Sequence, residues 1–154
     1  MTSISQETET AADRRIAELH ALLDQGLRDG VGVGASLGIL VESLAEGRAT
    51  YALSPSPATI NALFTVHGGV LTTLMDTAMG SAVFTTLGDG ALYTTLELKA
   101  NFVRAVQADG KRLTCVGQTI YVGRRTATAE ARITDPDGKL IAHGSCTCMI
   151  FPPE

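Results

Sequence analysis

One stretch of the chain decides its fold: Gly69-Val-Leu-Thr-Thr-Leu-Met-Asp76-Thr-Ala-Met-Gly80-Ser-Ala-Val-Phe-Thr85. It is long enough for about five helical turns. Its bulky side chains are apolar, and Thr, Ser and Gly fill the remaining positions, so the helix has no charged face. Such a helix is buried on nearly all sides. We therefore expect it at the centre of the domain, with a small-residue flank that admits another backbone, such as that of a second subunit.

A single carboxylate interrupts this apolar region. Asp76 is the only Asp, Glu, Lys or Arg between Ala49 and Gly88. An unpaired carboxylate is costly to bury, because it loses most of its hydration. Asp76 is therefore the first candidate for a functional side chain.

The remaining sequence predicts an α+β domain, with an antiparallel β-sheet wrapped around the central helix. Residues 1–10 are polar and predict a flexible N-terminal tail. Residues 11–30 predict an amphipathic N-terminal helix that ends near Gly30. The main domain is expected over 35–151. Its strands are predicted at 35–44, 47–53, 91–103, 112–122, 125–135 and 139–151.

Local patterns within this sheet support the strand predictions. From Leu92 to Phe102, two sets of side chains alternate without interruption, which is the period of a half-buried strand. Asp135-Pro-Asp-Gly138 has the residue types of a hairpin turn. Gly123-Arg124 is expected to make a second tight connection.

Composition excludes several classes of function. The 154 residues are 45% hydrophobic and carry a net charge of −4, which indicates one domain and argues against a nucleic acid partner. No apolar run approaches the roughly 18 residues of a membrane span. The polar N-terminus is unlike a signal peptide. We therefore expect a cytoplasmic protein without a membrane partner.

Two other patterns are interpreted as structural. Cys115, Cys146 and Cys148 lack a Cys-x-x-Cys spacing, so we expect buried thiols and neither a metal site nor a nucleophile. Gly32-Val-Gly34-Ala-Ser-Leu-Gly38 has the wrong spacing for a dinucleotide-binding loop, and we expect a strand to follow it directly. No cluster has metal-ligand spacing.

A glycine-rich entry precedes the central helix. His67-Gly68-Gly69 would leave free N–H groups at the helix N-terminus, where they can bind an anion or polarise a carbonyl group. Taken alone, it is more simply explained as a structural helix entry with an incidental histidine. Asn61, six residues earlier, and Asp76, nine residues later, favour a functional site.

The whole pattern, Asn61-x5-His67-Gly68-Gly69-x6-Asp76, resembles the hotdog-fold acyl-CoA thioesterases of the phenylacetate-pathway (PaaI-like) type. The resemblance covers about Ala35 to Phe151. It includes Val122-Gly-Arg-Arg-Thr-Ala-Thr-Ala-Glu130 and Asp137-Gly-Lys-Leu-Ile-Ala142, which match the closing strands of that family. It implies a hotdog fold, here with an extra N-terminal helix.

The resemblance also implies roles for individual residues. Asp76 takes the position of the catalytic carboxylate, which acts as a general base on water or as a nucleophile. The backbone N–H of Gly68 polarises the thioester carbonyl. The amide of Asn61 lines the site, and His67 braces the loop or contacts the thioester. Thr94 lies where relatives hold water near the carboxylate.

One related branch carries Glu at the acid position and Thr one helical turn later. Asp76 and Gly80 occupy these positions here, so the chain departs from that branch.

The spacing of two of these residues predicts a shared site. Gly68 and Asp76 are eight residues apart, which on one helix is a rise of ~12 Å. One thioester carbon must lie roughly 3 Å from both groups. Two antiparallel helices from two subunits meet this condition, as in the family's obligatory dimer. We therefore expect a homodimer with shared sites, paired into a dimer-of-dimers tetramer.

Coenzyme A carries phosphates that need local positive charge in an acidic protein. The leading candidates are Arg124 and Arg125, followed by Lys99, Asn101 and Arg104, and Gly69 and Gly123 are expected to contact the substrate beside them. No metal or redox cofactor is expected, since coenzyme A is part of the substrate.

The sequence thus predicts a thioesterase that hydrolyses an aryl or short- to medium-chain acyl-CoA to a free acid and CoA. One alternative is a non-catalytic acyl-CoA-binding hotdog module, which would not need the carboxylate. Another is an enoyl-CoA hydratase or dehydratase that uses His67 for proton transfer.

Overall fold

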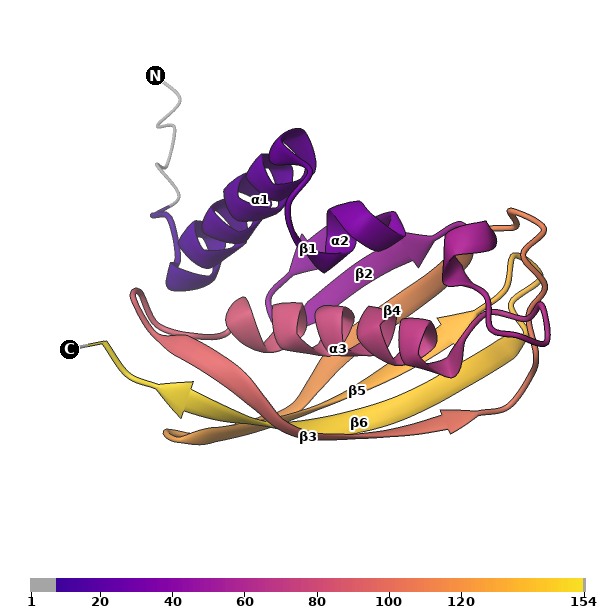
Figure 1. The fold of residues 1–154 in the computed structure, drawn as a ribbon. Coiled ribbons are helices and arrows are strands. Elements are labelled where there is room, and N and C mark those ends of the chain that lie inside the picture. The colour runs from indigo at the N-terminus through magenta and orange to yellow at the C-terminus, as the bar shows by residue number, and fades with distance from the viewer. Residues whose placement is uncertain (1–7, 154) are drawn as a thin grey trace, which may run out of the picture.

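Six antiparallel strands form a curved sheet around one long helix, α3 (Gly68–Phe84) (Figure 1). This computed structural model describes residues 8–153. The sheet order is β1-β2-β4-β5-β6-β3, so β1 and β3 form its edges. The strands are β1 (Ile39–Ala45), β2 (Arg48–Leu53), β3 (Leu92–Phe102), β4 (Leu113–Val122), β5 (Thr126–Thr134) and β6 (Leu140–Phe151). The expected α+β architecture is confirmed.

The N-terminal helix α1 (Ala11–Asp29) lies outside the sheet and its central helix (Figure 1). Thr10 and Asp13 form a capping box at its start, and Gly30 ends it at a φ of 65°. Residues 1–7 of the expected tail lie outside the described part of the chain. No helix within 8–153 is long and apolar enough to cross a membrane.

The glycine-rich segment after α1 differs from the prediction. A short helix, α2 (Gly32–Leu37), precedes β1, and Gly38 ends this helix at a φ of 71°. The strand predicted over 35–44 is therefore wrong for its first four residues. A glycine in the left-handed region is a common helix terminator, so this one marks the end of a helix. The other five strands begin and end within one residue of the predicted bounds.

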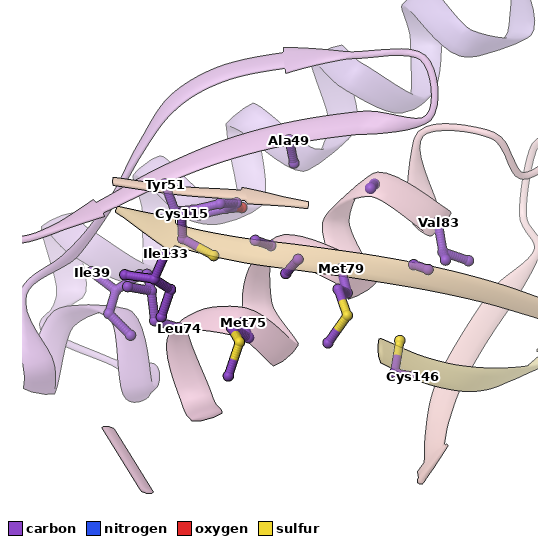
Figure 2. Packing of buried hydrophobic residues seen from close by; sticks show 14 of the residues in the cluster. Ile39, Ala49, Tyr51, Leu74, Met75, Met79, Val83, Cys115, Ile133 and Cys146 are labelled. Atoms are coloured by element: carbon purple, nitrogen blue, oxygen red, sulfur yellow. The ribbon is translucent and has the colours of Figure 1, made fainter. Parts of the chain in front are cut away.

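The core lies between α3 and the concave face of the sheet. Leu74, Met75 and Met79 of α3 are fully buried and pack with Tyr51 of β2 and Ile133 of β5 (Figure 2). The short 3₁₀ helix η1 (Pro57–Thr59) leads from β2 into the loop before α3.

A glycine lets α3 approach the sheet closely. A Cβ atom added at Gly117 of β4 would lie 2.7 Å from the backbone nitrogen of Met79 and closer still to the carbonyl group of Ala78. Only a residue without a side chain fits between β4 and α3 at this point. Gly117 therefore sets the depth of α3 in the sheet two residues after Asp76.

A bulge in β3 changes which side chains face α3. The register with β6 shifts between Thr95 and Glu97, and Leu96 in the bulge is 52% exposed. Tyr93, before the bulge, and Leu98, after it, both pack against the core. The predicted uninterrupted alternation is therefore wrong, because a bulge inserts one residue and inverts the phase.

The three cysteines are free and buried, as predicted. The sulfur atoms of Cys146 and Cys148 are 3.8 Å apart, far beyond the ~2.05 Å of a disulfide. Burial raises the pKa of Cys115 to about 12.

Candidate active site

At the N-terminus of α3, one backbone N–H group has no partner among residues 8–153. His67 is the N-cap, and its Nδ1 atom accepts a hydrogen bond of 2.8 Å from the N–H of Gly69. The carbonyl of His67 accepts from Val70 and Leu71. Across residues 8–153, nothing accepts from the N–H of Gly68. This group is available to an anion or a carbonyl oxygen, whereas the N–H of Gly69 is already used.

Asn61 shapes the loop before this helix. Its Oδ1 atom accepts from the N–H groups of Leu63 and Thr65, at 2.9 and 3.2 Å. Its Nδ2 atom donates to Thr65 Oγ1 at 3.0 Å. Phe64 at the loop tip has a φ of 62°, a conformation that costs energy for a bulky residue. The side chain of Asn61 therefore holds a strained turn in place.

Three predicted site residues line one cavity of about 280 Å³. They are Asn61, Gly68 and Arg104. Phe102, at the end of β3, also lines it and contacts Gly68, since a Cβ atom there would lie 3.1 Å from its ring. Arg104 is therefore the candidate phosphate-binding residue that the fold brings next to the free N–H group.

Asp76 lies in the middle of α3 and is half-buried. Its Oδ1 atom accepts a 2.9 Å hydrogen bond from Thr95 Oγ1. Thr94, which we expected to face the carboxylate, is exposed and pairs with Met149 on β6. The expected inward phase of Thr94 is wrong because the bulge inverts the alternation at this end of β3.

Tyr93 is a second hydroxyl beside the carboxylate that the sequence did not suggest. It lies two residues before Thr95, and its phenol packs on α3 at Gly80, one turn after Asp76: a Cβ atom there would lie 2.9 Å from the Tyr93 ring. Burial, followed by the nearby Cys148 and Asp76, raises the pKa of Tyr93. Within residues 8–153, its hydroxyl has no hydrogen-bond partner. Gly80 was the sequence feature that could have predicted this contact, since a glycine inside a helix often marks close packing with another element.

The free N–H group and the carboxylate lie apart on one chain. Both belong to α3, where eight residues span ~12 Å. Asp76 does not line the cavity that contains Gly68. Each chain thus carries two separate half-sites, one at the start of α3 and one at its middle.

The other predicted binding residues are dispersed. Lys99 is exposed on β3, and Asn101 is half-buried opposite His143. Arg124 and Arg125 are exposed in the β4–β5 turn, which the Gly123 N–H closes by donating to the carbonyl of Thr126.

That turn lies far from the Gly68 cavity of the same chain. Thr126 pairs with Met149, which also pairs with Thr94 near the start of β3. Phe102, at the other end of β3, contacts Gly68. The fold therefore does not bring Arg124 and Arg125 to Gly68. In the described part of the chain, no three His, Cys, Asp or Glu side chains gather as metal ligands.

Several known proteins are similar to this chain in sequence and in structure. The chain is 26% identical over 120 residues to a 1,4-dihydroxy-2-naphthoyl-CoA hydrolase of Listeria monocytogenes, which covers 78% of this chain and 96% of the relative. A thioesterase family protein from Silicibacter pomeroyi is 26% identical, with a TM-score of 0.76 over 92% of this chain and 98% of that one. The PaaI protein from the phenylacetic acid degradation operon of E. coli has a TM-score of 0.80 at 22% identity, over 94% and 98% of the two chains.

A family match covers the residues of both half-sites. The sequence model of the Thioesterase superfamily matches residues 64–142, a segment that includes Gly68, Asp76 and Thr95. The match spans just over half of the chain. The six-stranded sheet and its central helix are those of the hotdog-fold neighbours. The chain therefore belongs to the Thioesterase superfamily and has its hotdog fold.

Proposed function

We propose that this protein hydrolyses acyl-CoA thioesters, with Asp76 as the reactive carboxylate and the Gly68 N–H as the donor to the carbonyl oxygen. One observation carries the proposal: α3 presents a half-buried carboxylate held by Thr95, and its first N–H group has no acceptor within residues 8–153. Thioester hydrolysis needs these two functions, a base or nucleophile and a donor aimed at the developing oxyanion.

The chemistry follows from these two groups. As a general base, Asp76 takes a proton from water while the water oxygen adds to the thioester carbon. The negative charge that develops on the carbonyl oxygen is met by the Gly68 N–H. The C–S bond then breaks, and the thiolate of CoA leaves with the proton. As a nucleophile, the Asp76 carboxylate adds to the thioester carbon and the C–S bond breaks, so that the CoA thiolate leaves and a mixed anhydride forms. Water then hydrolyses this anhydride, which frees the acid, restores the carboxylate and supplies the proton that the thiolate takes up.

The two half-sites come together in a homodimer with shared sites. On one chain they are ~12 Å apart along α3, and the side of the helix that carries Asp76 also presents small half-buried residues such as Thr72 and Thr73. A partner α3 that runs antiparallel along this side brings its Gly68 to Asp76. The exposed edge of β3 offers a further pairing surface. Leu92 and Phe151, exposed register partners at that end of the sheet, support a further pairing into tetramers.

The substrate class rests on two considerations. Arg104 beside Gly68 supplies positive charge for a CoA phosphate, and the proposed reaction needs no cofactor beyond the CoA of the substrate. The relatives' names contain a dihydroxynaphthoyl-CoA and phenylacetic acid. They favour an aryl acyl group, and a short- to medium-chain acyl group is the alternative.

The role of His67 favours hydrolysis over hydration. Its Nδ1 atom is used as the cap of α3, so this nitrogen does not serve in proton transfer while the helix entry is intact. Hydration of an enoyl-CoA would require His67 to act through Nε2 alone. Product analysis with enoyl-CoA distinguishes the two reactions.

The first experiment replaces the carboxylate. Purified protein is assayed for thiol release from acetyl-, hexanoyl-, octanoyl-, benzoyl- and phenylacetyl-CoA. We expect Asp76→Asn to lower kcat by at least about a thousandfold with an unchanged oligomer, because it removes the reactive group. Asp24→Asn, an exposed acid on α1, serves as the matched control. Near-normal hydrolysis by Asp76→Asn contradicts the proposal, and tight acyl-CoA binding without turnover by the wild type indicates a binding module.

The second experiment removes the N–H donor. Gly68 is the first residue of α3, where proline is tolerated, and the extended conformation of His67 is compatible with a following proline. Gly68→Pro deletes the N–H group, whereas Gly68→Ala keeps it and adds a Cβ atom. We expect the proline variant to lose at least about a hundredfold in kcat relative to the alanine variant.

Mixing the two inactive variants tests the shared site. An Asp76→Asn chain paired with a Gly68→Pro chain forms one intact site and one doubly damaged site. Equal amounts, exchanged between subunits, should recover about a quarter of wild-type activity, since half of the dimers are mixed. No recovery in mixtures shown to contain mixed dimers contradicts sharing, and light scattering gives the mass of the assembly.

A further inference from the structure

A second cavity, of about 240 Å³, lies between the N-terminal helices and the hotdog domain. Its walls come from the C-terminal half of α1, from α2, from β1 and β2, and from a single residue of α3. The lining is apolar except for two hydroxyls: Leu22, Leu23, Gly26, Leu27, Val31, Gly32, Val33, Gly34, Ala35, Ile39, Val41, Tyr51 and Thr77. It contains no charged residue.

The two hydroxyls of this lining are already paired. Tyr51 Oη and Ser81 Oγ form a hydrogen bond of 2.8 Å, and Thr77 Oγ1 donates to the carbonyl of Thr73 at 2.8 Å. An apolar occupant therefore leaves no side-chain hydroxyl of the lining without a partner. A charged occupant would lose its hydration and find no counter-ion.

The cavity reaches the residue that follows the reactive carboxylate in α3. Thr77, its contribution from α3, directly follows Asp76. On a helix, consecutive residues are about 100° apart around the axis. Thr95 of β3 donates to the Asp76 carboxylate, and Thr77 is the residue of α3 that reaches the cavity wall. An acyl group whose carbonyl carbon lies at Asp76 would therefore pass Thr77 to enter the cavity, and the Thr77 hydroxyl is already bonded to the carbonyl of Thr73.

Helix α1, which forms the outer wall of the cavity, is fixed to the domain through Arg15 in its first half. Arg15 of α1 is only 2% exposed: its guanidinium lies 3.8 Å from the centre of the Phe84 ring and donates to the carbonyl of Ala91 at 2.6 Å. Nearer the cavity, Leu22 and Leu27 are 56% and 39% exposed. The first half of α1 is anchored to the hotdog domain, and the second half carries apolar side chains that the rest of residues 8–153 leaves partly exposed.

We propose that this cavity binds the acyl group of the substrate, an uncharged aliphatic chain of medium length or a single aromatic ring. The proposal rests on the proposed hydrolysis and adds the place and chemistry of the acyl site. Apolar cavities of about 150 Å³ hold a benzene molecule, so 240 Å³ accommodates a ring with a short linker. Most of its lining precedes residue 64, where the superfamily match begins.

The test fills the cavity and measures acyl-chain preference. Ala35 of α2 is half-buried in the lining, and Ala17 is exposed on α1 away from it. Wild type, Ala35→Phe and Ala17→Phe are assayed with acetyl-, octanoyl- and phenylacetyl-CoA. We expect Ala35→Phe to lower kcat/KM for the octanoyl and phenylacetyl substrates about tenfold or more while acetyl-CoA changes less than about twofold. Ala17→Phe should keep the wild-type profile.

A second variant enlarges the same cavity. Leu27→Ala should shift the preference toward longer chains, such as decanoyl-CoA, relative to octanoyl-CoA. This variant tests the proposal even if Ala35→Phe does not fold, because Leu27 is partly exposed and its truncation should disturb the fold little. A cooperative thermal unfolding transition, measured for each variant, confirms that the variant is folded at the assay temperature.

The possible failures are distinguishable. If the wild type hydrolyses no acyl-CoA, the proposed function itself fails. If the wild type hydrolyses the panel but folded Ala35→Phe and Leu27→Ala keep its chain-length profile, the acyl site lies elsewhere and hydrolysis stands. A change of oligomeric mass in Ala35→Phe with an unaltered profile also overturns the proposal, because the surface then binds another copy of the chain.

Discussion

Replacing Gly117 by alanine should displace the reactive helix without touching the reactive residues. The new Cβ atom would lie 2.7 Å from the backbone nitrogen of Met79, about 0.7 Å inside ordinary contact at 3.4 Å, and nearer still to the carbonyl of Ala78. These are backbone atoms of α3, so no side chain can rotate away. The helix and β4 must separate by most of an ångström, one turn or less from Asp76.

Two magnitudes follow for Gly117→Ala. Overpacking of this kind costs about 1–3 kcal/mol, which for a chain of this size lowers Tm by about 3–9 °C. A displacement near 1 Å at a reacting group costs up to about a hundredfold in rate. We therefore expect kcat/KM for octanoyl-CoA to fall about ten- to a hundredfold at 25 °C, where the variant is still folded.

The assay combines thermal unfolding with thiol release, and Gly88→Ala is the matched control. A Cβ atom at Gly88 meets nothing within 4 Å, and this residue does not need a positive φ. The control should keep wild-type Tm and kcat/KM. If Gly117→Ala is as stable and active as Gly88→Ala, α3 does not depend on this close approach and the reasoning is wrong.

Three further substitutions test individual contacts. Thr95→Val removes a hydrogen bond to a carboxylate worth about 1.5–3 kcal/mol, so kcat should fall about ten- to a hundredfold, whereas Thr94→Val should change it less than about twofold; equal effects would contradict the pairing with Asp76. Tyr93→Phe removes a hydroxyl without a partner in the described chain, so Tm should stay within about 2 °C while kcat falls about fivefold; an unchanged kcat would remove Tyr93 from the site. Arg15→Met keeps the volume but removes the carbonyl and ring contacts, and urea unfolding should show a loss of about 2–3 kcal/mol; a smaller loss than about 0.5 kcal/mol would show that α1 is held by other contacts.

The fold followed from patterns that extend over many residues. The uncharged helix around Asp76 and the six apolar segments determine which surfaces must be buried. Gly38 was misread for a local reason: a glycine can end a helix as well as precede a strand, and neighbouring residues alone did not distinguish the two. The depth of α3 at Gly117 depends on backbone atoms from two distant segments, which no local pattern reveals.

The sequence predicted the candidate site less completely than it predicted the fold. Asp76 and the Gly68 entry were predicted from a lone carboxylate and a glycine-rich helix start, while Asn61 and the catalytic roles of all three came from the family resemblance and stay predictions. The partner of Asp76 comes from β3, and a bulge at Leu96 decides whether Thr94 or Thr95 reaches it. A bulge depends on the pairing of two strands, so the strand sequence alone gave the wrong threonine.

The three buried cysteines allow a thiol-release assay to report unfolding of the protein as well as its activity. An aromatic disulfide reagent added to detect free CoA reacts only with accessible thiolates. Cys115, Cys146 and Cys148 are each at most 2% exposed, so the native chain should add no background colour. Any slow signal of up to three thiols per chain without substrate would instead report unfolding. A variant's activity and its structural integrity can thus be recorded in the same cuvette.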